Sequence, residues 1–124
     1  GLAYVHLGHV NIVPIHYVHA DGWLYGRTGA GTKLRALRHH PWVAFEVDEV
    51  DDHGAWRSVV VRGALYLLRR DGPAAERARW AHAVTLLRAI APDAFTAADP
   101  TPERTTVFRI HVGEVTGRVV LGAV

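Results

Sequence analysis

The sequence contains no cysteine among its 124 residues. This absence excludes disulfide bonds, thiolate metal sites and cysteine nucleophiles, although it does not report the redox compartment. The sequence also has no apolar run near the roughly 18 residues that a transmembrane helix needs, and no signal peptide is visible. We therefore expect no membrane association and a cytoplasmic location.

The two signs of charge are nearly balanced, since the sequence has 14 Lys and Arg residues and 12 Asp and Glu residues. The basic residues gather at Arg35 and Arg38 and again at Arg69 and Arg70. A nucleic-acid surface needs a denser basic patch with exposed aromatic residues between the charges. The composition therefore argues against nucleic acid as a partner.

Nine histidines raise the question of a metal site. His39 and His40 are adjacent and would point to different sides of a helix, while His16 and His19 would lie on opposite faces of a strand. Neither pair has the spacing of a zinc motif with further His or carboxylate partners. We predict no metal site.

The chain has the length of one domain, which we assign to residues 1–124. Its pattern predicts a mainly β fold with two helices, and small strand-rich domains of this kind tend to close as barrels. Because the chain starts without Met, we also expect that the full protein has a further N-terminal segment. The expected strands are Leu2–Leu7, Val10–His19, Trp23–Thr28, Trp42–Val50, Ala55–Leu68 and Thr105–Val115, and the expected helices are Thr32–His40 and a second one from Asp71-Gly72-Pro73 to about Ile90.

Three positions within this pattern have special backbone requirements. Pro14 cannot donate to a strand ladder, so it marks an edge, a bulge or a place where something other than a strand lies alongside. Asp21-Gly22 is typical of a hairpin turn that needs positive φ. Gly63, in the middle of a long strand, predicts a bend or bulge.

A glycine-rich stretch is the most informative part of the chain, and it runs YGRTGAGTKLRALRHHP from Tyr25 to Pro41. Its glycines let backbone N–H groups approach an anion, and the following helix start adds partial positive charge. Thr28 and Thr32 offer hydroxyl donors, and Lys33 offers a full charge. The stretch therefore suggests a phosphate cradle. A strand-to-helix turn with a solvated lysine fits the local pattern equally well, because a lone Gly-x-Gly is a weak signal.

The segment from Ile12 to Leu68 resembles the pyridoxamine 5'-phosphate oxidase-like family of FMN-binding split barrels, and especially its nitroimidazole-resistance branch. The order and spacing of four pieces agree with the family pattern. These pieces are Val13-Pro14-Ile15-His16-Tyr17-Val18; Asp21-Gly22 with Leu24-Tyr25-Gly26-Arg27-Thr28; Gly31-Thr32-Lys33-Leu34 with Leu37-Arg38 and Pro41-Trp42-Val43; and Phe45-Glu46-Val47-Asp48 with Trp56-Arg57-Ser58-Val59 and Val61-x-Gly63.

The resemblance implies a six-stranded antiparallel split barrel that forms a homodimer with FMN in grooves between the subunits. It implies that residues from three parts of the chain bind the cofactor. Segment 13–17 would line the flavin ring, the strand end and the glycine-rich loop would hold the ribityl chain and phosphate, and two residues would reach the cofactor from the partner subunit. These residues are, in that order, Val13, Pro14, Ile15, His16 and Tyr17; Arg27, Thr28, Thr32 and Lys33; and Trp56 and Ser58.

The chemistry expected from the resemblance is that of a flavin oxidoreductase acting on small nitro- or quinone-like compounds. We find no Ser-His-Asp or paired-carboxylate arrangement, and flavin chemistry does not require one. His16 is the candidate catalytic residue because it lies on the expected flavin-lining strand and titrates near neutrality. Thr32 stands where many relatives have Arg or Ser, and the arginine-rich C-terminal motif of the vitamin oxidases is absent. A flavin-binding module without turnover, and the same fold with deazaflavin or haem, remain alternatives.

Overall fold

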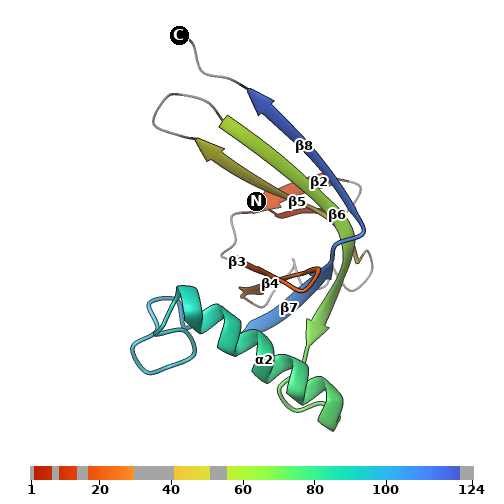
Figure 1. Cartoon of the computed structure of the whole chain (residues 1–124). Coiled ribbons are helices and arrows are strands. Elements are labelled where there is room, and N and C mark those ends of the chain that lie inside the picture. The colour runs from red at the N-terminus through yellow and green to blue at the C-terminus, as the bar shows by residue number, and fades with distance from the viewer. Residues whose placement is uncertain (1, 7–8, 14–16, 30–40, 51–55, 121–124) are drawn as a thin grey trace.

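Eight strands and one long helix make up the part of the chain that the computed structural model describes, which comprises residues 2–6, 9–13, 17–29, 41–50 and 56–120 (Figure 1). Every strand pairing is antiparallel. The elements are β1 (Leu2–His6), β2 (His9–Val13), β3 (Tyr17–Ala20), β4 (Trp23–Thr28), β5 (Trp42–Val50), β6 (Trp56–Leu68), α2 (Ala74–Ile90), β7 (Thr106–His111) and β8 (Glu114–Val120).

Strand β6 belongs to two sheets, and Figure 1 shows it curving from one to the other. Its first part lies between β5 and β8, in a sheet that continues through β1 to β2. Its last residues pair with β7, in a sheet that continues through β4 to β3. We call these sheet A and sheet B. This mainly β, antiparallel arrangement with a shared, bent strand is consistent with a split barrel.

Strand β6 changes sheets beside Gly63, where the sequence predicts a bend or bulge: its pairing with β8 ends at Arg62 and its pairing with β7 begins at Leu65. A Cβ atom added at Gly63 would overlap the backbone carbonyl oxygen of His111. The N–H of Gly113 donates to the carbonyl oxygen of Arg62 at 3.2 Å, so the backbone of the β7–β8 connection packs directly on the bend. Only a residue without a side chain allows the two backbones to come this close.

Two of the expected strands are each interrupted, so the expected count of six strands is not confirmed. In place of one strand over 10–19, β2 ends at Val13 and β3 begins at Tyr17, and the two lie at opposite ends of the strand order. Pro14 lies outside the described residues, so the prediction made for it stays a prediction. In place of one strand over 105–115, the chain leaves β7 after His111 and enters β8 at Glu114. The expected helix over 32–40 lies outside the described residues.

The hairpin between β3 and β4 confirms the predicted turn. Ala20 pairs with Trp23, which leaves Asp21 and Gly22 as a two-residue loop. Asp21 has a φ of 52° and Gly22 a φ of 80°. Positive φ at both positions is the requirement of the turn type that matches strand twist, and Asp-Gly meets it at little cost.

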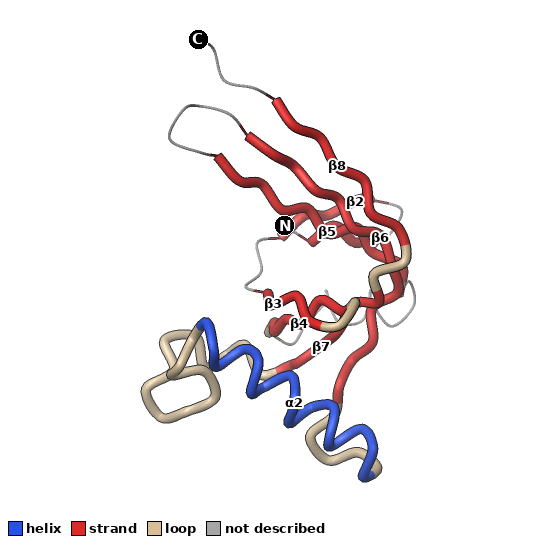
Figure 2. The backbone as a smooth tube through the Cα atoms, in the orientation of Figure 1, coloured by secondary structure: helices blue, strands red, loops and turns tan. Residues whose placement is uncertain are grey.

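The two faces of sheet B are buried in different ways, because successive side chains of a strand point to opposite faces. One face turns into the barrel, and α2 covers the other, as Figure 2 shows. The barrel core comprises Leu24, Val43, Phe45, Val61, Leu65, Phe108 and Ile110. The core beneath the helix comprises Tyr25, Leu68, Ala83, Val84, Leu87 and Val107.

Helix α2 begins directly after Pro73, as the sequence predicts, and proline is well suited to the start of a helix. Its buried residues are Ala83, Val84 and Leu87. The sequence also favours an apolar stripe of Trp80, Val84, Leu87 and either Ile90 or Ala91 on this helix. Of the two alternatives at its end, Ile90 is 55% exposed, whereas Ala91 is half-buried.

Candidate functional site

The structure describes part of the predicted cofactor site. Val13 is the last residue of β2, and Tyr17 is the first of β3. Trp56 and Ser58 lie in the first part of β6, where Ser58 pairs with Asp48 on β5. The predicted contacts Pro14, Ile15, His16, Thr32 and Lys33 lie outside the described residues, so their roles stay predictions.

Tyr17 packs into the barrel rather than standing apart from it. Its ring meets the ring of Phe45 edge to face, with centroids 4.7 Å apart. Tyr17 pairs with Gly26 across the β3–β4 hairpin, and its side chain is half-buried. The described contacts therefore give Tyr17 a packing role, and contact with a flavin through its remaining surface stays a prediction.

Arg27, near the end of β4, is buried, and other groups of the protein accept hydrogen bonds from most of its guanidinium N–H donors. Nη1 and Nη2 donate to the two carboxylate oxygens of Asp99, at 3.3 and 2.7 Å. Nε donates to the carbonyl oxygen of Arg104 at 2.9 Å, and Nη2 also donates to that of Thr101 at 3.0 Å. Since a guanidinium has five N–H donors, these four bonds leave little capacity for a ligand phosphate.

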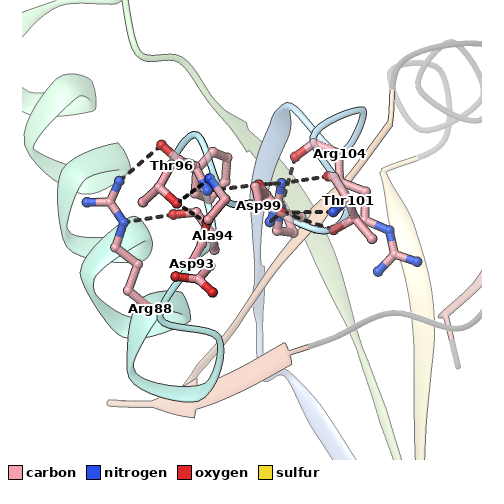
Figure 3. A network of polar contacts seen from close by, with 10 residues as sticks. Arg88, Asp93, Ala94, Thr96, Asp99, Thr101 and Arg104 are labelled. Carbon is pink, nitrogen blue, oxygen red and sulfur yellow. Dashed lines mark hydrogen bonds and ion pairs between the residues drawn. The ribbon is translucent and has the colours of Figure 1, made fainter.

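Asp99 is the partner that the sequence analysis missed. Besides Arg27, its carboxylate accepts from the backbone N–H of Phe95 at 2.8 Å and from that of Thr101 at 3.0 Å (Figure 3). The hydrogen bonds from Arg27 hold the pKa of this carboxyl well below its usual range, with the two backbone bonds acting in the same direction. An Asp carboxylate often accepts from the backbone N–H two residues later, at the start of a turn. The run Asp99-Pro100-Thr101 could therefore have predicted the bond from Thr101.

The loop between α2 and β7 is fastened at a second point by Arg88. Its Nε donates to the carbonyl oxygen of Ala94 at 2.9 Å (Figure 3). Phe95 follows with a φ of 61°, and its ring lies 4.2 Å from the guanidinium carbon of Arg27. Contacts from both β4 and α2 therefore hold this loop, which we call the Asp99 loop (residues 91–105).

Thr28 and Gly29 bring β4 to the start of the glycine-rich stretch. Thr28 is buried and pairs with Thr106 at the start of β7. A Cβ atom added at Gly29 would lie 3.4 Å from the carbonyl oxygen of Glu103, so the Asp99 loop borders this strand end closely. The Arg27–Asp99 pair thus fixes the backbone from which the predicted phosphate cradle departs.

A cavity of about 680 Å³ opens at the same end of sheet B. It lies where β6 ends and β7 begins, and residues from α2 and the Asp99 loop complete its wall. Thr106, the strand partner of Thr28, is one of its lining residues. The cavity therefore borders the end of β4, from which the chain continues into the predicted cradle.

A family model described as pyridoxamine 5'-phosphate oxidase matches residues 1–119. The chain belongs to this family. The resemblance seen in the motifs is thereby confirmed over nearly the whole chain. A comparison with curated proteins finds no match.

Several solved structures of other proteins share the fold. An FAD-binding protein from Mesorhizobium loti is 28% identical, with a TM-score of 0.76 over 96% of this chain and 83% of that one. The FAD-binding protein from Mycobacterium smegmatis is 25% identical, with a TM-score of 0.60 over 97% and 85% of the two chains. A Bacteroides thetaiotaomicron protein, provisionally described as a 5-nitroimidazole antibiotic resistance protein, is 22% identical, with a TM-score of 0.64 over 95% and 74%. At 22% identity, the similarity to the Bacteroides protein shows only that the fold is shared.

Two further observations bear on the function class. Within the described ranges, no group of three or more His, Asp or Glu side chains is placed to hold a metal ion. Among the same residues, no helix combines the length and the apolar character needed to cross a bilayer.

Proposed function

We propose that this chain is a flavin-binding oxidoreductase that works as a homodimer. Membership of the pyridoxamine 5'-phosphate oxidase family over residues 1–119 carries the proposal. The geometry at the end of β4 supports it, because Thr28 and Gly29 lead from an ordered strand end straight into the predicted phosphate cradle. When bound, the flavin supplies hydride and electron transfer, and the protein supplies position and charge.

In this proposal, Lys33 is the residue that neutralises the charge of the flavin phosphate. Arg27, the other cation predicted to contact the cofactor, already shares its charge with Asp99. The hydroxyl groups of Thr28 and Thr32 and the backbone N–H groups of the glycine-rich loop complete the cradle. We accordingly assign Arg27 the role of holding the strand end and the Asp99 loop, and Lys33 the role of phosphate ligand.

The reaction that we propose is reduction of a small nitro- or quinone-like acceptor by electrons from a reduced nicotinamide. His16 would polarise the acceptor over the flavin ring, which segment 13–17 would line, while Trp56 and Ser58 would approach the flavin from the partner subunit. The cofactor that we proposed from the sequence is FMN. The similarity to FAD-binding proteins from two organisms makes FAD its direct competitor. The cytoplasmic location stays a prediction.

The cofactor is tested by absorbance. The purified protein is incubated with FMN, FAD, a deazaflavin or haem, passed over a gel-filtration column and scanned, and the released cofactor is identified by chromatography. Retention of about one flavin per subunit supports the proposal, and retention of haem alone would overturn it. Oxidation of a reduced nicotinamide with a nitro or quinone acceptor present then separates an enzyme from a binding module.

Lys33 allows a sharper test because it is the only lysine of the chain. Lys33→Ala should weaken flavin binding by about ten- to a hundredfold, since a charge-assisted hydrogen bond contributes about 1.5–3 kcal/mol. Arg77→Ala, which removes an exposed cation on α2, is the matched control and should leave the affinity unchanged.

The same residue can be observed directly in the unmodified protein. Flavin should protect Lys33 from an amine-acylating reagent. Mass spectrometry of the peptide that contains Lys33 measures the acylated fraction. Equal acylation with and without bound flavin, or unchanged affinity in Lys33→Ala, would remove Lys33 from the phosphate site.

A further inference from the structure

The cavity at the end of sheet B has a cationic rim that the proposed flavin site does not use. Arg69 and Arg70 follow directly on β6, and both line the cavity with exposed side chains. Nε of Arg69 lies 3.7 Å from Asp71 in an ion pair whose members are 70% and 81% exposed, so water weakens it. In the part of the chain that the structure describes, no carboxylate pairs with Arg70, and its guanidinium carbon lies over the Trp80 ring, 5.7 Å from the ring centre. Two guanidinium groups at one rim form a site suited to a phosphate, which each can bind through two N–H groups.

Aromatic rings form another wall of the same cavity. Trp80 of α2 and Phe95 of the Asp99 loop meet edge to face, with centroids 6.2 Å apart. Phe95 is held in place, because its ring lies against Arg27 and its N–H is bonded to Asp99. Leu67 and Leu68 add apolar surface. A flat aromatic group can lie against such a wall without first ordering it.

Hydroxyl groups complete the lining between these two features. Thr105 and Thr106 line the cavity at the start of β7 and offer donors and acceptors to a sugar. The volume of about 680 Å³ lies within the range of roughly 300–1,000 Å³ that is usual for small-molecule sites. Cations, aromatic rings and hydroxyl groups thus converge on one hollow of ligand size.

We propose that this cavity binds a nucleoside phosphate, with the base against Trp80 and Phe95, the phosphate at Arg69 and Arg70, and the sugar near Thr105 and Thr106. Such a group has two sources. It is either the adenylate half of a bound FAD whose flavin lies in the predicted groove, or a separate nucleotide. The pairing of Thr106 with Thr28 places the cavity beside the strand end that leads to the predicted cradle, which favours the first source. Only the choice of source rests on the proposed function.

Binding of AMP, measured by calorimetry on the purified full chain, tests the site. AMP should bind saturably, and Arg70→Gln should weaken it by about tenfold or more. Arg77→Gln is the matched control, because Arg77 is an exposed arginine of α2 outside the cavity lining, and it should bind AMP as the wild type does. Adenosine, which lacks the phosphate, should bind weakly and equally to both variants. No saturable AMP binding at millimolar concentration, or equal loss in both variants, overturns the proposal.

Comparison of FAD with FMN identifies the source. If the adenylate half of FAD occupies the cavity, Arg70→Gln lowers the affinity for FAD but not for FMN, and loading with FAD abolishes AMP binding. If a separate nucleotide occupies it, FAD-loaded protein binds AMP unchanged. AMP binding without any flavin retention supports the cavity and overturns the flavin proposal, whereas a protein that retains flavin but does not bind AMP when it is free of flavin gives the opposite result for both.

Discussion

Asp99 shows how one carboxylate can organise a long loop. It joins β4 to the Asp99 loop through Arg27 and closes the loop on itself through two backbone N–H groups. Its side chain is 3% exposed and that of Arg27 is 6% exposed. Because little water reaches either group, each charge needs its partner to remain stable in the interior. Loss of either partner should disturb the strand end at Thr28 as well as the loop.

The lowered pKa of Asp99 predicts how stability depends on pH. Because the folded carboxyl has a pKa below that of the unfolded chain, about 3.9, its contribution is present above that value and is lost as the pH falls through the folded pKa. Asp99→Asn should therefore melt below the wild type at pH 7, and the difference should shrink as the pH falls below 4. Thermal melts by circular dichroism from pH 7 to pH 2 measure this difference.

The exposed Asp93 of the same loop provides the control for this experiment. Asp93→Asn should melt close to the wild type throughout the pH range. A difference between Asp99→Asn and the wild type that stayed constant down to pH 2 would show that the carboxylate charge is not what stabilises the loop.

Gly63 is the second single residue on which the fold depends. Gly63→Ala should destabilise the protein by about 1–3 kcal/mol, because its Cβ must displace the backbone at His111. Gly113→Ala is the control, since its Cβ would lie 3.4 Å from the nearest backbone atom, and it should change stability by no more than about 0.5 kcal/mol. Urea denaturation compares the two, and equal stabilities would mean that the bend relaxes without cost.

At the scale of elements, α2 is held to sheet B by a few side chains in its middle. Leu87→Ala should cost about 2–5 kcal/mol, because Leu87 is 2% exposed and its loss leaves a cavity beneath the helix. Ile90→Ala, one turn later and mostly exposed, should cost no more than about 0.5 kcal/mol. Denaturant titrations of both variants check this contrast, and similar losses would place Ile90 in the buried stripe after all.

The elements that the sequence predicts well are those set by local chemistry. Asp21-Gly22 marks its hairpin, Pro73 marks the start of α2, and the alternation of Phe45 and Val47 with Glu46 and Asp48 marks β5. The breaks at the ends of β2 and β7 were not predicted. Each depends on which sheet the chain joins next, and an alternating pattern does not carry that information.

The candidate site, like the fold, was predicted where a local pattern names the residues and was missed where a contact joins distant parts of the chain. The motif residues from Val13 to Ser58 were named from the family pattern, and the family itself is confirmed. The Arg27–Asp99 pair was not predicted, because its members are 72 residues apart and neither lies in a pattern that names the other. The sequence showed a cation at the strand end, and only the fold shows that this cation already has a partner.

At the scale of the whole molecule, one exposed aromatic side chain, that of Trp42, is a candidate contact for the second copy that we propose. Trp42, the first residue of β5, is 70% exposed, which is unusual for so large an apolar side chain. If the protein is the homodimer that we propose, Trp42 is a candidate anchor, because buried tryptophans contribute strongly to interfaces. Trp42→Ser should raise the dimer dissociation constant by about tenfold or more, as measured by sedimentation equilibrium.

Ile90→Ser supplies the comparison for this experiment, since it removes an exposed apolar side chain from the end of α2. That variant should dimerise as the wild type does. A wild-type chain that sediments as a monomer at micromolar concentration would contradict the shared-groove arrangement altogether.

Strand β6 makes the two sheets inseparable. Residues 56–62 pair with β5 and β8, and Leu65–Leu68 pair with β7, so one continuous backbone carries hydrogen bonds of both sheets. Melting of either sheet frees part of β6 and removes a partner strand from the other. The protein should accordingly unfold as one cooperative unit, and its β6 amides should be among the last to exchange with solvent.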